Sequence, residues 1–393
     1  MAQFKKLSLA VAAVTLLGAN AAHAVDLQAG DWKLSVGGNV NAFAIANTCD
    51  KSGNAAINGA VVCQGQDSFN IGNGLLPNEI SFSASTRQDD LDINAVISLW
   101  PTINTTAAGE TGTGSGTTGT GLNSRQGFFT FGDKSWGTVK LGRDLGIFGS
   151  DAILSDMTLL SVGSGTPAKG PTSLGHIGTG YLYADWIPQI SYATPSFNGL
   201  AANVGIVQGL ASTSGVSNKQ PGFQGKVTYD TAVSGVNAHL WAGFMTQKNE
   251  ASGTVQAFDS TAYEVGAKLG IGDFEGVGYY YDGDGAGTTV IGNLASDTNG
   301  NKRKSKGGYV QGTYKIQKVK LGLSYGESSL DLASGEVNND LIKKNSSGVA
   351  SIYYSLTKSI TLVGEYVNTK SERQAGGGDL KQDTVAVGGI IFF

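Results

Sequence analysis

The chain has 393 residues, a formal net charge of −4 and 59 glycines, about twice the usual share of glycine. The mildly acidic balance argues against nucleic acid as a partner, because surfaces that bind nucleic acid are strongly basic. After the N-terminal segment, no run approaches the roughly 18 apolar residues that a membrane-spanning helix needs. The composition therefore disfavours a nucleic-acid-binding domain and excludes a helical membrane bundle.

Residues 1–24 have the pattern of a cleaved secretory signal peptide. Two lysines form its charged region, residues 7–17 form an apolar core too short to span a membrane, and the tripeptide at 22–24 supplies a small-residue cleavage site. A mitochondrial presequence would be rich in arginine, and this segment has none. We therefore expect an exported chain whose single mature domain comprises residues 25–393.

The chain contains two cysteines, Cys49 and Cys63, and both lie in a polar stretch rich in asparagine and glycine. Their spacing does not fit a CxxC redox motif or a zinc site. Because cysteines of exported proteins meet an oxidising compartment, we expect these two to form a structural disulfide.

Short segments of alternating polarity follow one another through the mature chain. In the clearest one, apolar Leu240 and Phe244 alternate with His239 and Trp241. Long gaps between these segments alternate with short ones, such as the two residues Asp89 and Asp90. The predicted strands are 32–46, 79–88, 91–100, 125–131, 137–143, 187–195, 200–208, 222–230, 235–247, 260–269, 274–281, 307–316, 318–326, 347–357, 359–369 and 382–393.

The last predicted strand ends on Phe393, and Val385, Val387, Ile391 and Phe393 share one face of it. A terminal strand frays unless another strand holds it, so we expect it to pair with the first strand and close a barrel. Long loops at one end and short turns at the other are typical of outer-membrane barrels. We therefore predict an all-β protein, a sixteen-stranded antiparallel transmembrane barrel wide enough to hold an aqueous channel.

Three segments carry a family resemblance. The sequences RQGFFTFG (125–132) and WGTVKLGR (136–143) form a paired-strand motif that leads into a long segment, and ISYATPSFNGL (190–200) follows that segment. A closing hairpin begins near residue 358 and ends on Phe393. Together they resemble the trimeric general porins of Gram-negative bacteria, in particular the β-proteobacterial type.

The resemblance implies a homotrimer in the outer membrane, in contact with membrane lipid and lipopolysaccharide. It implies that a third loop, at about 144–185, folds inward and narrows the pore, and that the barrel-assembly machinery reads Phe393 as part of its signal. Acidic loop residues would face basic residues on the wall. The candidates are Asp144, Asp151 and Asp156 on the loop, and Arg87, Arg125, Lys140 and Arg143 on the wall.

Each candidate has a second interpretation. Loop aspartates commonly hydrogen-bond the backbone of their own loop. Arg143 would equally brace the base of the loop, and Arg87 lies near the short-turn mouth. Lys140 faces inward if Val139 and Leu141 face lipid. Glu79 stands where the family often has arginine, so the sign of ion selectivity stays open.

The mature sequence offers little for catalysis. Hydrolysis needs a nucleophile, a base and an orienting group, but only His176 and His239 remain after signal cleavage, on separate segments. No GxSxG or HExxH motif lies near either histidine, and no phosphate loop, metal cluster or dinucleotide fingerprint appears. We therefore predict no enzyme activity, no cofactor and no metal, and we regard His239 as a lumen-lining residue.

We predict a porin, a water-filled channel for passive diffusion of ions and small hydrophilic solutes across the outer membrane. One alternative is a substrate-specific channel, which would need a ladder of lumen aromatics beyond Trp241, Tyr279 and Tyr281. Another is an adhesin or phage-receptor role in long loops such as 101–124 and 282–306, where residues 302–304 form a basic run.

Overall fold

A computed structural model of the chain describes residues 25–103, 122–165, 172–210, 218–251, 253–375 and 378–393. The predicted signal peptide lies outside the described residues, and so does most of the loop 101–124.

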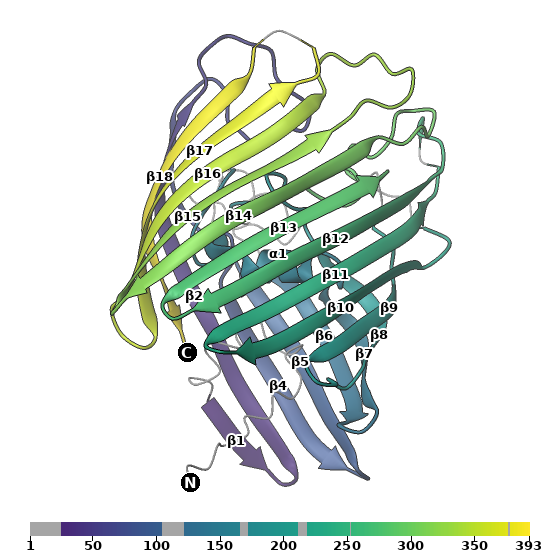
Figure 1. Cartoon of the computed structure of the whole chain (residues 1–393), viewed down its shortest axis with the longest axis vertical. Coiled ribbons are helices and arrows are strands. Elements are labelled where there is room, and N and C mark those ends of the chain that lie inside the picture. Colours follow the sequence, from purple (N-terminus) through teal and green to yellow (C-terminus); the bar gives the residue numbers. More distant parts are fainter. Residues whose placement is uncertain (1–24, 104–121, 166–171, 211–217, 252, 376–377) are drawn as a thin grey trace.

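The strands form one closed antiparallel barrel (Figure 1). The ring closes where β18 pairs with β2, from Gln382 opposite Cys49 to Phe392 opposite Asn39. Within the described part of the chain, the predicted sixteen-stranded barrel is therefore confirmed. Its long strands are β2 (Trp32–Cys49), β4 (Glu79–Gln88), β5 (Leu91–Pro101), β6 (Leu122–Asp133), β7 (Gly137–Leu145), β8 (Trp186–Ala193), β9 (Leu200–Val207), β10 (Gly222–Val233), β11 (Val236–Asn249), β12 (Phe258–Ile271), β13 (Phe274–Asp284), β14 (Lys304–Ile316), β15 (Val319–Leu330), β16 (Ile342–Ser355), β17 (Ile360–Arg373) and β18 (Leu380–Phe392).

Two short strands were not predicted. β1 (Val25–Ala29) forms a hairpin with the start of β2, and β3 (Ser68–Gly72) pairs with β2 over residues 43–47. Because β4 pairs only with residues 33–39 of β2, β3 continues the ladder where β4 stops. Each of these strands has five residues, too few for a period-two pattern to stand out in the sequence.

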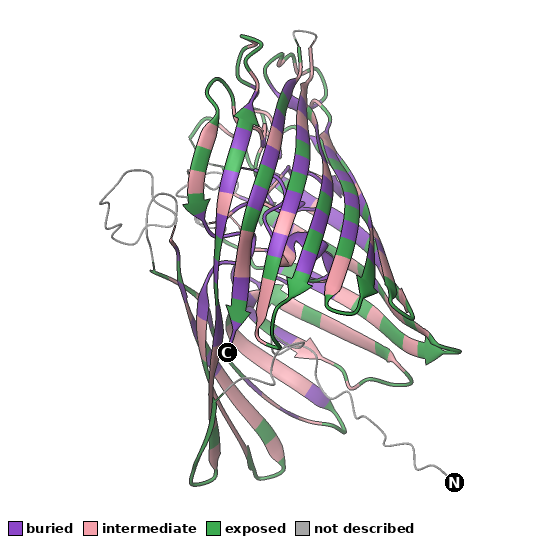
Figure 2. Ribbon diagram, turned by 90° about the vertical axis from the view of Figure 1, so that its left-hand side faces the viewer, coloured by how far each residue is buried: buried purple, intermediate pink, exposed green. Residues whose placement is uncertain are grey.

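Buried and exposed residues alternate along the long strands (Figure 2), because successive side chains of a strand point to opposite faces. On β11, Leu240 and Phe244 are 39% and 40% exposed on the outer face, whereas Trp241 and Met245 are each 2% exposed on the inner face. On β18, Val387 is 61% exposed on the outer face. So many exposed apolar side chains around one barrel fit a lipid environment rather than water.

No helix in the described part of the chain is both long and apolar enough to cross a membrane.

Two short helices lie between β7 and β8, in the segment that we call L3 (described residues 146–165 and 172–185). They are α1 (Ser150–Ser155) and the 3₁₀ helix η1 (Met157–Leu160). Figure 1 shows α1 inside the ring, behind β11 to β13. L3 thus folds inward, as predicted, and its buried side chains form the core together with the inner wall.

Close packing inside the barrel requires glycine at particular positions of the wall. A Cβ atom on Gly266 would lie 2.0 Å from the ring of Trp241. A Cβ atom on Gly326 would lie 2.3 Å from the carbonyl oxygen of Thr179 in L3. Since real Cβ atoms do not tolerate such distances, glycine lets the ring and the loop approach the wall.

Candidate pore constriction

The first residues of L3 are anchored by two wall side chains. The main-chain N–H groups of Ile147 and Phe148 donate to Oε1 of Gln224 on β10, at 2.8 and 3.0 Å. The N–H of Gly149 donates to the carboxylate of Glu264 on β12, at 3.0 Å. α1 has no side-chain cap of its own, so these wall residues satisfy donors at the helix entrance.

A second group of anchors holds the middle of L3 against β14. The hydroxyl of Tyr309 donates to the carbonyl oxygen of Ala152 at 2.7 Å. Gln311 accepts from the N–H of Met157 at 2.9 Å and donates to the carbonyl oxygen of Ser155 at 2.8 Å. Both side chains therefore replace the hydrogen bonds that a short helix cannot make internally.

Glu365 on β17 anchors the part of L3 that follows η1. Its carboxylate is 5% exposed and accepts from the N–H groups of Val162 and Gly163, at 3.1 and 2.6 Å. The hydroxyls of Ser161 and Ser351 donate to it as well, the latter at 2.7 Å. A buried carboxylate is costly unless it is hydrogen-bonded. The loop therefore supplies the donors that Glu365 needs, and Glu365 holds residues 161–163 of the loop against the wall.

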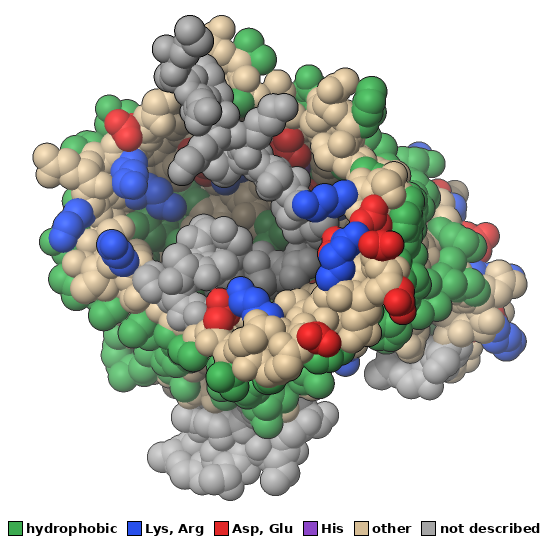
Figure 3. Space-filling view, turned by 90° about the horizontal axis from the view of Figure 1, so that it is seen from below, with side chains coloured by type: hydrophobic (Ala, Val, Ile, Leu, Met, Phe, Trp, Pro, Cys, Tyr) green, Lys and Arg blue, Asp and Glu red, His purple; other side chains and the backbone are tan. Residues whose placement is uncertain are grey.

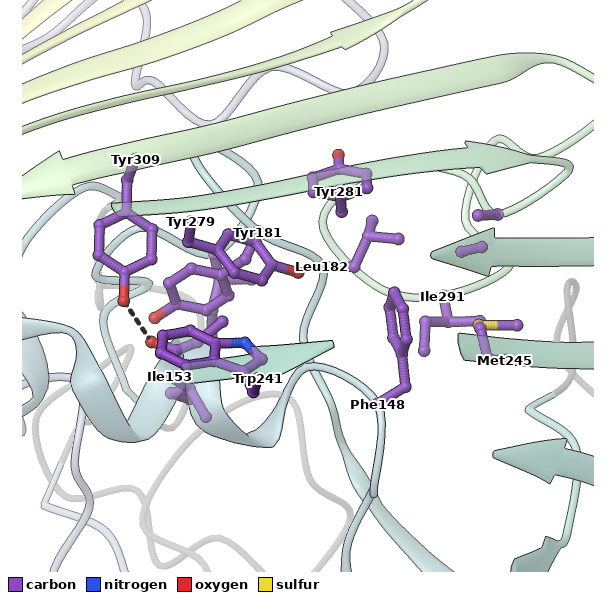
Figure 4. Close-up of a cluster of buried hydrophobic side chains, with 14 of the residues drawn as sticks. Phe148, Ile153, Tyr181, Leu182, Trp241, Met245, Tyr279, Tyr281, Ile291 and Tyr309 are labelled. Atoms are coloured by element: carbon purple, nitrogen blue, oxygen red, sulfur yellow. Dashed lines mark hydrogen bonds between the residues drawn. The ribbon is translucent and has the colours of Figure 1, made fainter. Parts of the chain in front are cut away.

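An apolar cluster fills the space between α1 and the wall of β11 to β14 (Figure 4). The ring centroids of Tyr279 and Tyr309 lie 5.7 Å apart, and those of Trp241 and Tyr279 lie 6.3 Å apart. Tyr281 is fully buried in the same cluster. These aromatic side chains pack under L3 and do not form a ladder along an open lumen.

A cavity of about 1930 Å³ occupies the barrel between L3 and the short-turn end. Its lining runs from turn residues such as Asp31 and Gly272 up to Asp151 and Leu154 of α1. Figure 3, viewed from below, shows acidic and basic side chains around a hollow at this end. The described residues thus surround an aqueous space whose inner limit is the start of α1.

Asp151 is the L3 carboxylate that contacts basic side chains of the wall, on β10 and β11. It pairs with Nζ of Lys226 on β10 at 2.5 Å and with Nε2 of His239 on β11 at 3.3 Å. Nδ1 of His239 lies 2.8 Å from the carboxylate of Asp230. Burial alone would raise the pKa of Asp151, but the charge of Lys226 and the hydrogen bond from His239 outweigh it and lower this pKa to about 2. Asp151 is therefore ionised at neutral pH.

A second pair of charges lies at the root of L3. Lys140 on β7 forms an ion pair with Asp144, and the side-chain amide of Gln126 donates to Asp144 at 3.0 Å. Lys140 and Asp144 both line the cavity, on the inner face of β7.

Asp156, by contrast, lies inside L3. It is 3% exposed, accepts from the N–H of Thr158 at 2.9 Å and from the hydroxyl of Tyr181 at 2.8 Å, and does not line the cavity. Its carboxylate also accepts from the N–H of His176 at 3.2 Å. This placement favours the second interpretation of the loop aspartates, hydrogen bonding within the loop.

The three arginine candidates are not brought together. Arg143 is exposed on the outer face of β7, and its Nε donates to the carbonyl oxygen of Trp186 at 3.0 Å. Arg125 lies over the Trp100 ring, at 5.1 Å from the centroid. Arg87 lines the cavity near the short-turn mouth, with Asp92 and Asp133 at 2.7 and 3.0 Å.

Several functional residues escaped the sequence reasoning. Lys226 was not a candidate, although it forms an ion pair with Asp151 of L3. The anchors Gln224, Glu264 and Glu365 were also missed. The alternation of polarity was the available signal, because each of these residues is polar and falls on the inner face of its strand.

At the opposite end, the long loops are joined to one another. Cys49 and Cys63 form a disulfide, with Cα atoms 5.2 Å apart. In the basic run, Arg303 and Glu336 form a buried ion pair with Nε to Oε2 at 2.8 Å, and Lys302 pairs with Asp284 at 2.6 Å. The hydrogen bonds of Glu336 with Arg303 lower the pKa of this carboxyl. Arg303 is thus committed to cross-linking two loops of this chain.

The closed barrel, its lipid-facing surface and the loop folded into its lumen define a transmembrane β-barrel channel. The sequence matches the Gram-negative porin family over residues 8–374, and the chain belongs to this family. Curated proteins give no significant match to the sequence. The protein is therefore an integral outer-membrane channel for passive diffusion, and its family and fold point to a channel rather than an enzyme.

Solved structures share this fold at low sequence identity. The outer-membrane channel DcaP of Acinetobacter baumannii is 17% identical, with a TM-score of 0.69 over 93% of this chain and 99% of that chain. The anion-selective porin of Comamonas acidovorans is also 17% identical, with a TM-score of 0.65 over 92% of this chain and 100% of that chain. The trimer form of OmpT from Vibrio cholerae is 13% identical, with a TM-score of 0.56 over 92% of this chain and 99% of that chain.

Proposed function

We propose that L3 forms the constriction of a general porin and that the ion pairs at its lumen side select small hydrophilic solutes and ions. The observation that carries this proposal is the position of Asp151, which stands on α1 at the inner limit of the cavity and forms ion pairs with Lys226 and His239 of the wall. Charged side chains that line a narrow passage orient water, set ion preference and penalise apolar solutes.

Two pairs make up the proposed constriction set. The pair of Asp151 and Lys226 lies at the start of α1, and the pair of Lys140 and Asp144 lies at the root of L3. Arg87 belongs to the vestibule below them. Asp156, Arg143 and Arg125 are assigned to bracing, because their recorded contacts are within L3 or with the strand ends around it.

We expect weak overall ion selectivity. The residues that line the cavity include eight lysines and arginines and eight aspartates and glutamates, so their fields largely cancel at a distance. The preference for anions or cations therefore depends on the charges nearest to the passing ion. The field of more distant ion pairs is screened beyond about 10 Å in ordinary salt.

We further propose that three copies assemble in the outer membrane. A trimer form is known for the OmpT barrel, which shares the fold. Phe393 pairs with Gly38 on β2, at 2.8 and 3.1 Å, and its ring is 43% exposed on the outer face. That position suits a terminal signal for the barrel-assembly machinery, and the exposed outer face suits lipid and lipopolysaccharide contacts.

Liposome swelling with neutral sugars of increasing size tests the sieving function. A general porin gives rates that fall steeply and smoothly with solute size and do not saturate with concentration. Saturation by one solute would instead support the substrate-specific channel. Chemical cross-linking in detergent, read as a ladder that ends at three copies, tests the trimer separately.

A further inference from the structure

Three lysines line one side of the vestibule, and none of them was a sequence candidate. They are Lys268 on β12, Lys315 on β14 and Lys320 on β15, and we call them the lysine site. All three line the cavity near the short-turn end, and Lys268 lies directly opposite His239 in the pairing of β11 with β12.

The strand register places two of these lysines face to face. Lys315 is the direct antiparallel partner of Lys320, and both residues point to the cavity. Directly opposed residues have Cβ atoms about 5 Å apart, and like charges in that arrangement are destabilising. A pairing that weakens the sheet has a natural explanation if an anion lies between the two ammonium groups.

Nearby carboxylates compensate this charge only in part. Glu275 on β13 pairs with Lys268 at 2.9 Å. In the adjacent turn, Asp273 accepts the main-chain N–H of Lys315 through its carbonyl oxygen at 2.9 Å, and its carboxylate lines the same cavity. No ion pair with a described carboxylate is made by Lys315 or Lys320.

Lys320 is held in place by an aromatic ring. Its Nζ lies 4.5 Å from the ring centroid of Tyr353, the residue that faces it on β16. A cation over the face of a ring is attracted by the ring, and its long side chain loses freedom. The ammonium of Lys320 is thus positioned at the wall with its remaining donors free for a ligand.

We propose that the lysine site binds small solutes that carry two or more phosphate or carboxylate charges. Such a solute bridges Lys315 and Lys320 and offsets the repulsion between their two ammonium groups. A chloride ion carries one charge and offsets this repulsion only in part, so it binds more weakly. This inference rests on the proposed channel function, since it assigns a class of solute to the same lumen. It adds a binding step in the vestibule, before or after the constriction.

Inorganic pyrophosphate is a suitable probe. Titration calorimetry on the detergent-solubilised protein should detect its binding to wild type, and the double variant Lys315→Gln/Lys320→Gln should weaken binding about tenfold or more. Lys318→Gln is the matched control, because Lys318 lies in the turn of the same hairpin and outside the cavity lining. Equal affinity in wild type and the double variant would overturn the site.

Planar bilayers separate this proposal from the channel function. Pyrophosphate added to the short-turn side should reduce the current through wild type and Lys318→Gln, and the double variant should need about tenfold more for the same block. If wild type shows no conductance steps in potassium chloride, the channel proposal fails, while the calorimetry still decides the site. Heat-dependent mobility on gels verifies that each variant is folded.

Discussion

The two sides of L3 have opposite characters. Toward β12 to β17, the loop is dry: wall side chains accept or donate hydrogen bonds to its backbone, and aromatic rings fill the space between. Toward β7, β10 and the short-turn end of β11, where His239 lies, it is wet and charged, with ion pairs that border the cavity. The comparison teaches that the shape of the aperture and its charge are determined by different residues.

Removal of the Glu365 carboxylate should detach L3 from β17 on the dry side, and we expect it to have the largest effect on stability and conductance. In Glu365→Ala, the N–H groups of Val162 and Gly163 lose their buried acceptor, at a cost of about 1–3 kcal/mol for each unsatisfied group. We expect a lower unfolding temperature, a larger single-channel conductance and entry of larger sugars. Bilayer recordings and liposome swelling measure these changes.

Glu365→Gln is the matched control for this change. Its amide oxygen still accepts from the loop N–H groups, so conductance should stay close to that of wild type. If Glu365→Ala folds and conducts like wild type, Glu365 does not hold the aperture, and the division of L3 into two sides is incorrect.

Two aspartates of L3 sharpen the comparison, because they lie on its different sides. Asp151→Asn removes a lumen charge and leaves Lys226 unbalanced, so the chloride-to-potassium permeability ratio should rise about two- to threefold. Asp156→Asn should leave that ratio unchanged and cost about 1–2 kcal/mol of stability, because Asp156 accepts hydrogen bonds inside the loop. Reversal potentials under a salt gradient measure the first effect, and thermal unfolding measures the second. A shift of equal size in both variants would contradict this assignment.

A fall in pH from 7 to 4 should have the smallest effect, because Asp151 on the charged side of L3 stays ionised over this range. The folded pKa of Asp151 is about 2, below its usual value of 3.8. A lowered pKa means that the contribution of Asp151 is complete above the usual value and disappears as the pH falls through about 2. The difference in reversal potential between wild type and Asp151→Asn should therefore persist from pH 7 to pH 4. Its disappearance by pH 5 would show that Asp151 is not held as an ion pair.

The fold was predictable from the sequence because a barrel strand carries its own signal. Alternation of polar and apolar residues marks each strand, and the order of long and short gaps marks its direction. The same alternation places Lys140 inward, and it places Arg143, two positions after Leu141, outward with Val139 and Leu141. β3 was missed because its five residues lie in a long gap without a repeating pattern.

The constriction was predictable only in part, since a loop has no such period. Asp151 and Asp156 look alike in the sequence, but α1 directs the first to Lys226, and the second accepts the N–H of Thr158 at the start of η1. The anchors of L3 lie far along the chain from it: Glu365 and Val162 are separated by 203 residues. One sequence does not reveal which inward-facing polar residue meets which part of a folded loop.

The closure of the ring by β2 and β18 has a kinetic consequence. Side chains that meet across this seam, such as Asn47 and Gln382, are 335 residues apart, so the seam forms only after nearly the whole chain is available. Until then, β2 and the growing end of the sheet each expose an unpaired edge, and such edges invite aggregation. Contacts of this length also slow folding. The chain therefore depends on being kept from premature association until its last strand arrives.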